Sequence, residues 1–133
     1  MSAQLLLELR PQRYKYINKG ITIMGRYIST TGTANIVTRE ISTTYQAVSA
    51  DRLICNASGA PFTITLPAVA DVMVGDQIQI IDAASQFATN NITVDRNGAL
   101  IGGAAEDLTL DVIGSVVTLL YTGATYGWVI VST

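Results

Sequence analysis

Apolar and polar residues alternate with a period of two along much of this sequence, and almost no stretch repeats with the 3.6-residue period of a helix. Phe62, Ile64 and Leu66, for example, are separated by single threonines, which places the three apolar side chains on one face of a strand. Segments 61–66, 76–82, 91–95 and 108–112 all alternate in this way, whereas 115–122 and 128–131 are continuous apolar runs, typical of strands buried on both faces. The pattern predicts a succession of short strands.

Residues that favour turns separate these segments. The strongest signal is Asn97-Gly98, because both residues tolerate a positive φ, and similar groups stand at 56–59, 74–76 and 122–124. Strands that recur about every ten residues are typical of sandwiches, jelly rolls and small barrels. We therefore predict an all-β fold, with an antiparallel β-sandwich or a jelly-roll or barrel-like body.

The first third of the chain differs from the rest in pattern and in charge. Segments 4–10 and 21–28 have strand-like composition, but polar and loosely patterned residues surround them. Residues 1–40 contain six basic and two acidic residues, a net charge of +4, whereas residues 41–133 contain two basic and eight acidic residues, a net charge of −6. We predict an extended arm over residues 1–42, with one or two strands and the contacts for attachment or oligomerisation, and a β-rich body domain over 43–133.

The composition indicates that partners cover much of the surface. Only 14% of the residues are charged and 49% are hydrophobic, whereas about a quarter of the residues in a typical globular domain are charged. No apolar run approaches the roughly 20 residues of a membrane-spanning helix. The first ten residues lack the features of a signal peptide, so we expect neither a membrane partner nor export.

Several classes of catalytic and metal chemistry have no residues to support them. The chain contains no histidine, which excludes Ser-His-Asp and Cys-His nucleophilic catalysis and the common zinc sites. Glu106 and Asp107 are adjacent and would point to opposite faces of a strand, and three further acids lie at strand ends. We interpret all five as solvated turn or cap residues; the three are Asp82, Asp95 and Asp111. The single cysteine, Cys55, lies in an apolar run and is interpreted as a small core residue. We expect no enzyme activity, no cofactor and no metal.

Two groups of residues are candidates for binding. Basic residues of the arm are the candidates for contact with a partner protein, although tyrosines between them leave a nucleic-acid interpretation that the acidic chain as a whole disfavours. Near the other end of the chain, Tyr126 and Trp128 are candidates for stacking on a glycan, with core packing as the alternative. The arm candidates are Arg10, Arg13, Lys15, Lys19 and Arg26.

The order of these elements from residue 45 to 131 resembles a β-module of tailed-bacteriophage virion proteins, found in tail fibres and in small head-decoration or head-fibre proteins. The resemblance implies a virion surface protein, commonly trimeric, that is anchored through its N-terminal part. It does not extend to residues 1–42. The residues that carry it are 45–48, 51–56, 64–68, 74–78, 81–83, 92–98, Ile101 and 127–130.

Together, these observations predict a non-enzymatic structural protein of the virion surface, made in the host cytoplasm. The leading hypothesis is a capsid decoration (cement) or head-fibre protein that binds the assembled shell, as a homotrimer in contact with the major capsid protein or another virion protein. The alternative is a tail-fibre or neck-appendage protein that binds a host glycan. A polysaccharide-degrading enzyme that uses Glu106, Asp107 or Asp111 is a third hypothesis. We do not expect nucleic acid as a partner.

Overall fold

The computed structural model describes residues 35–132, and in this range the chain is almost entirely strand and loop, which confirms the all-β prediction. One short 3-10 turn, η2 (Val69–Asp71), is present. The strands are β2 (Val37–Ile41), β3 (Tyr45–Gln46), β4 (Asp51–Cys55), β5 (Phe62–Thr65), β6 (Gln77–Asp82), β7 (Ile92–Asp95), β8 (Leu108–Leu110), β9 (Val116–Tyr121) and β10 (Trp128–Ser132). The strands predicted at 4–10 and 21–28 lie outside the described residues.

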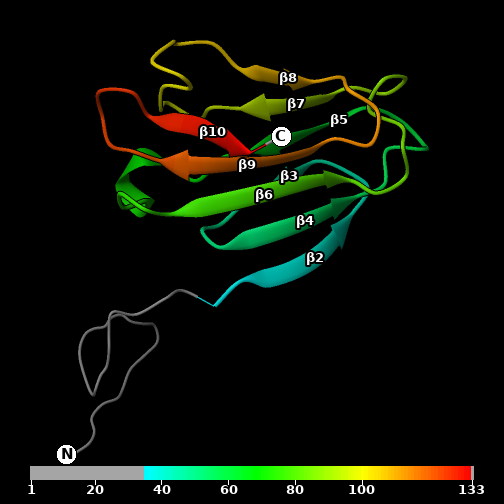
Figure 1. The fold of residues 1–133 in the computed structure, drawn as a ribbon, viewed down its shortest axis with the longest axis horizontal. Coiled ribbons are helices and arrows are strands. Elements are labelled where there is room, and N and C mark those ends of the chain that lie inside the picture. Colours follow the sequence, from blue (N-terminus) through cyan, green and yellow to red (C-terminus); the bar gives the residue numbers. More distant parts are fainter. Residues whose placement is uncertain (1–34, 133) are drawn as a thin grey trace, which may run out of the picture. The chain divides into compact units, whose positions relative to one another are not determined.

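The strands form two mixed sheets (Figure 1). One sheet has five strands in the order β10-β9-β6-β4-β2, and the other has four in the order β3-β5-β7-β8. From β2 to β7 the chain alternates between the sheets, so each strand is followed by one in the opposite sheet. Strand β2 precedes the predicted boundary at residue 42, yet it pairs with β4 of the predicted body.

The prediction of antiparallel pairing is wrong for the first part of this body. The pairs β2·β4, β4·β6, β3·β5 and β5·β7 are parallel. A chain that leaves one sheet, crosses in the other and returns must run in its original direction, and this winding makes successive strands of each sheet parallel. Antiparallel pairing occurs only afterwards among the described strands, in β7·β8, β6·β9 and β9·β10.

Alternation along the strands produces a single core. In β4, β5, β6 and β7 every second residue is buried, as the sequence pattern predicted. The buried side chains of both sheets form one hydrophobic cluster, which at roughly 1.5–3 kcal/mol for each large side chain is the main stabilising contribution. Its largest fully buried members include Trp128, Phe87, Leu53, Ile64 and Leu66.

Strand β10 differs from the prediction made for residues 128–131. Among the described strands it pairs with β9 alone and forms an edge of its sheet, apart from one isolated bridge between Trp128 and Ile101, so its dense apolar run is not buried on both faces. Ile130 and Val131 are 43% and 49% exposed, whereas Trp128 at its start is fully buried. A continuous apolar run therefore indicated a strand correctly but not its position in the sheet.

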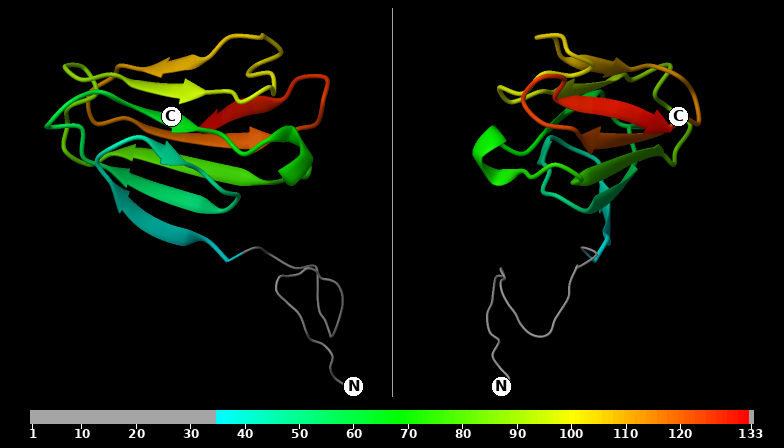
Figure 2. Two further views of the ribbon diagram at one scale, coloured as in Figure 1. Left: turned by 180° about the vertical axis from the view of Figure 1, so that it is seen from behind. Right: turned by 60° about the vertical axis from the view of Figure 1, so that its left-hand side comes forward.

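The loops gather at two ends of this two-sheet body (Figures 1 and 2). Even-numbered strands start at the end of the body where odd-numbered strands finish. The connections between strands therefore fall into two sets, one at each end. Hydrogen bonds join loops of the first set to the ends of neighbouring strands, such as Ala50 N to Gln77 O of β6 (2.9 Å) and Gly75 N to Tyr121 O of β9 (2.9 Å). We call the first set the pocket end, because a pocket lies there. It comprises residues 35–36 with Val37 at the start of β2, and residues 47–50, 66–76, 96–107 and 122–127. The other set, the far end, comprises 42–44, 56–61, 83–91 and 111–115.

The sequence signals for turns at the pocket end correspond to real turns. Asn97 and Gly98 both have positive φ, at 49° and 88°. They begin the connection of residues 96–107 between β7 and β8, not a two-residue hairpin. Within that connection, Ile101 and Ala104 form an isolated antiparallel bridge across a tight bend.

Candidate functional site

Exposed apolar side chains concentrate at the pocket end. Among the described residues, eleven large hydrophobic side chains are exposed, and seven of these belong to the pocket end. Two of the others lie on edge strand β10 and two at the far end. Exposed apolar residues that gather in one region are typical of an interaction surface, whereas scattered ones need no explanation. The seven are Ile36, Val37, Val48, Val69, Met73, Val74 and Tyr126.

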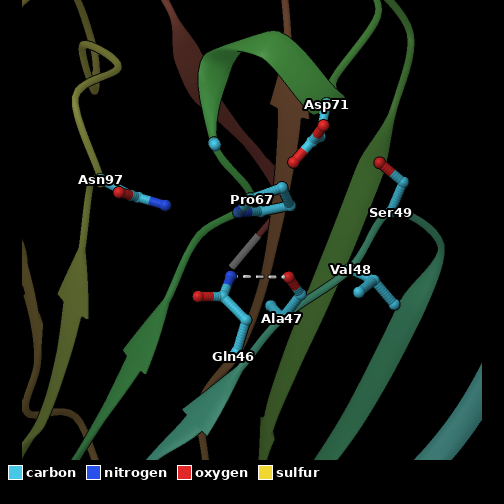
Figure 3. Close-up of a pocket in the computed structure, with 8 residues that line it drawn as sticks. Gln46, Ala47, Val48, Ser49, Pro67, Asp71 and Asn97 are labelled. Atoms are coloured by element: carbon cyan, nitrogen blue, oxygen red, sulfur yellow. Dashed lines mark hydrogen bonds between the residues drawn. The ribbon is translucent and has the colours of Figure 1, made fainter.

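An open pocket of about 500 Å³ lies at this end (Figure 3). It is formed by the loop between β3 and β4, the segment that leads from β5 into η2, and the start of the connection after β7. Its apolar wall consists of Ala47, Val48, Pro67 and Ala68, and its polar residues are Gln46, Ser49, Asp71 and Asn97. In Figure 3, Asp71 and Ser49 lie on one side of the pocket and Asn97 on the other.

Most of the polar groups around the pocket already have partners. The Gln46 amide donates to the backbone oxygens of Thr65 and Leu66, each at 3.2 Å. Asn97 Nδ2 also donates to Leu66 O, at 2.9 Å. The Ser49 hydroxyl donates to Asp76 at 2.8 Å. These bonds fix the shape of the pocket by joining segments that are far apart in the sequence.

The carboxylate of Asp71 differs from these polar groups because it has no partner in the described part of the chain. Within residues 35–132 it accepts no hydrogen bond and meets no cation, and its side chain is exposed at the end of η2. Since the pocket contains no basic side chain, its net charge is negative. A group that fits this pocket would combine an aliphatic part, to lie against Val48 and Pro67, with a positively charged or hydrogen-bond-donating end.

A buried carboxylate holds the pocket wall in place. Asp51, at the start of β4, accepts hydrogen bonds from Arg39 Nε at 3.0 Å, Tyr45 Oη at 2.9 Å and the backbone N of Val48 at 3.0 Å. Burial and this hydrogen bond raise the pKa of Tyr45, and the bond to Asp51 raises the pKa of Arg39. Asp51 thus joins β2, β3 and the 47–50 loop. The sequence analysis did not identify this role of Asp51. The one signal for it in the sequence is that Asp51 takes the same inward position as Leu53 and Cys55 in the alternation along β4.

A second buried carboxylate organises the far end. Asp82 accepts hydrogen bonds from the backbone N atoms of Gln86, Phe87 and Gly114, at 3.0, 3.1 and 2.8 Å. Burial alone would raise the pKa of Asp82, but the backbone donors outweigh it and the pKa is lowered. The interpretation of Asp82 as a solvated residue is therefore wrong, because its carboxylate is buried and accepts hydrogen bonds from the backbone of two loops.

The other carboxylates do not converge. Glu106 and Asp107 lie at the pocket end and Asp111 at the far end, so the structure does not bring the three together. Asp107 accepts a hydrogen bond from the backbone N of Arg96 at 3.0 Å, as expected for a turn residue. Residues 35–132 contain no group of three or more His, Cys, Asp or Glu side chains placed to hold a metal ion.

The two aromatic candidates for glycan binding, Tyr126 and Trp128, differ in exposure. Tyr126, in the turn between β9 and β10, is 63% exposed and accessible to a ligand. Trp128 is fully buried and packs edge to face against Tyr121, with the ring centroids 5.3 Å apart. The interpretation of Trp128 as a glycan contact is therefore wrong, because its ring belongs to the core and cannot be reached from outside.

Cys55 is buried, as predicted, and burial raises the pKa of its thiol to about 12. The arm residues Arg10, Arg13, Lys15, Lys19 and Arg26 lie outside the described residues. No helix within residues 35–132 has the length and apolar character needed to cross a bilayer.

Comparison with protein families and with curated proteins gives no relative. No protein-family model matches the sequence, and no curated protein matches it. The function is therefore argued from the residues and their arrangement.

Proposed function

We propose that this chain is a non-enzymatic structural protein of a tailed-bacteriophage virion, a capsid decoration (cement) or head-fibre protein that binds the assembled shell. The observation that carries the proposal is the division of the chain into a basic segment and an acidic body with an exposed apolar end. Residues 1–34 contain five basic residues and one acidic residue, whereas residues 35–132 contain three basic and nine acidic ones. The resemblance of residues 45–131 to phage virion modules supports the same assignment.

In this proposal the body is a β-sandwich. Within residues 35–132 each of the two sheets has two edge strands, β10 and β2 in one and β3 and β8 in the other, whereas a closed barrel has no edge. The shared hydrophobic cluster is that of two facing sheets. A jelly roll would need antiparallel neighbours throughout, which the four parallel pairs do not provide.

The binding energy would come mainly from the apolar pocket end, at roughly 25 cal/mol for each Å² of apolar surface removed from water. The basic arm would steer the docking and provide attachment. A homotrimer on the outside of the particle would bind the assembled shell and not its free subunits, so it would stabilise the shell by mass action. Such a protein would be made in the host cytoplasm and end on the virion surface, next to the major capsid protein or another virion protein.

The test is a comparison of particles with and without this protein. We expect cryo-electron microscopy to show its density on the head, and particles that lack it to lose their DNA at a lower temperature. Adding back the Arg13→Gln variant should restore less protection at physiological salt than adding back the Arg52→Gln variant. Both changes remove one positive charge, but Arg52 lies on β4 of the body and bonds to Gln79. Particles of equal heat resistance with no density on the head would contradict the proposal.

The exposed ring of Tyr126 favours one alternative, a tail-fibre or neck-appendage protein that binds a host glycan. In that case density would appear on the tail or neck. A glycan array would give specific binding, which the Tyr126→Ala variant would lose while keeping the stability of the parent protein.

A further inference from the structure

The pocket at Asp71 has the chemistry of a receptor for a basic side chain. Its wall of Val48, Pro67 and neighbouring alanines can cover an aliphatic stem, and its one charged lining residue is an acid with no partner among residues 35–132. Asp76 lies next to the pocket through its hydrogen bond from Ser49, which adds a second negative charge. Because the Asp71 side chain is exposed, an ion pair there would have the modest strength of a surface pair, and burial of the aliphatic stem against the apolar wall would add to it.

The body does not supply that cation itself. Its three arginines, the only basic residues from 35 to 132, are each bonded elsewhere. Arg39 binds Asp51 at 3.0 Å, Arg52 donates to Gln79 Oε1 at 3.0 Å, and Arg96 donates to Ala99 O at 2.9 Å. The other five basic residues of the chain belong to residues 10–26.

Strand β2, the first described strand after residues 1–34, starts at the pocket end. Val37, the first residue of β2, donates its backbone N–H to Ala50 O at 2.9 Å, and Ala50 follows the pocket-lining residues Val48 and Ser49. The nine residues from Arg26 to Asn35 can span up to about 30 Å. The 25 residues from Arg10 to Asn35 can span up to about 80 Å. A sphere with the radius of gyration of about 13 Å expected for a domain of this size has a diameter of about 33 Å, so the segment that carries the basic residues is long enough to reach a neighbouring molecule.

We propose that this pocket binds an arginine or lysine side chain from residues 10–26 of a second copy of this chain. Each copy then offers one basic segment and one acidic pocket, so the contact is head to tail and closes into a ring when the rotation permits. The inference deepens the proposed function, on which it rests for the idea that copies assemble. It is tested in solution without any shell, so its failure is distinguishable from a failure to bind virions.

The first experiment is analytical ultracentrifugation of the full-length chain at low and high salt. We expect concentration-dependent self-association that weakens as salt rises. The Asp71→Asn variant should associate about five-fold more weakly, the loss expected for a charge pair at the upper limit of exposed pairs. The matched control is Asp111→Asn, which removes the same charge at the far end and should leave association unchanged. A monomeric wild type, or equal effects of the two variants, would overturn the proposal.

A mixing experiment then distinguishes a contact between copies from a contact within one chain. One variant carries Asp71→Asn with an intact arm, and the other carries glutamine at all five basic arm positions with an intact pocket. Each variant alone should associate weakly, but the mixture should form a heterodimer, because the arm of the first fits the pocket of the second. No heterodimer would mean that the pocket does not receive the arm of another copy.

Discussion

A glycine in the turn between β9 and β10 provides a quantitative test of the structure. Gly127 has a φ of +71°, and a Cβ added there would lie 1.9 Å from the backbone oxygen of Leu100. That oxygen also accepts a hydrogen bond from Trp128 N at 2.8 Å. Gly102 is a matched control, since its φ is +60° but a Cβ would meet nothing within 4 Å. The Gly127→Ala and Gly102→Ala variants therefore share a conformational cost and differ in the steric clash.

The expected losses of stability can be estimated from these contacts. An alanine with a positive φ destabilises the folded state by about 1–2 kcal/mol, whereas the lower flexibility of the unfolded chain stabilises the protein by about 0.4–1 kcal/mol. Gly102→Ala should therefore lower the free energy of unfolding by about 1 kcal/mol. Gly127→Ala must also displace the Leu100 backbone, which breaks a hydrogen bond worth about 1 kcal/mol and loosens the packing of Trp128. We expect it to cost about 3–4 kcal/mol in total, since a complete loss of such a core side chain costs about 3–5 kcal/mol.

Urea unfolding followed by tryptophan fluorescence measures both losses. The chain has a single tryptophan, and it is the buried Trp128, so the signal reports on this region of the core. In thermal unfolding, each 1 kcal/mol corresponds to about 4–8 °C for a domain of this size. If the two variants lost the same free energy to within about 0.5 kcal/mol, the close approach of Leu100 to Gly127 would be wrong.

Three further predictions concern buried polar groups. Asp82→Asn should destabilise the body at neutral pH. Because the pKa of Asp82 is lowered in the folded state, the contribution of its charge to stability is complete above the ordinary pKa of 3.8 and is lost as the pH falls through the folded pKa. The difference in unfolding free energy between this variant and wild type, measured in urea, should therefore shrink only below about pH 4. Cys55 has a buried thiol with its pKa raised to about 12, so iodoacetamide should label it only at the rate of unfolding, and rapid labelling of the native chain would contradict its placement. Tyr45→Phe removes one of three donors to Asp51 and should cost about 1 kcal/mol in urea unfolding, whereas Tyr126→Phe, at an exposed ring, should cost nothing measurable.

Much of the strand structure was predictable because alternation is a local property. The segments 61–66, 76–82 and 91–95 correspond closely to β5, β6 and β7, and the burial of Cys55 is explained by its place in an alternating run. The turn at Asn97-Gly98 was predictable for the same reason, since positive φ is a preference of the residues themselves. The long connection after that turn, which extends to residue 107, was not predictable from these local preferences.

The candidate site was much less predictable. Gln46, Asp71 and Asn97 are separated by about 25 residues each and meet only because consecutive strands cross from one sheet to the other. Only Asn97 belongs to a sequence signal, and that signal indicates a turn, so no spacing in the sequence indicated a pocket. Trp128 shows the converse, since an aromatic residue near a turn fits either a ligand platform or a core, and only packing against Tyr121 decides between them.

The sequence by itself therefore determined the strands from β5 to β10, several of the turns between strands, and how charge is divided between residues 1–34 and the rest. These are properties of single residues and their near neighbours. The tertiary structure alone decided which strands pair, that the first pairs are parallel, that β10 is an edge and that Asp71 borders a pocket. Those outcomes depend on contacts between residues that are distant in the chain. Alternation with a period of two does not reveal these contacts, because it suits parallel and antiparallel neighbours equally well.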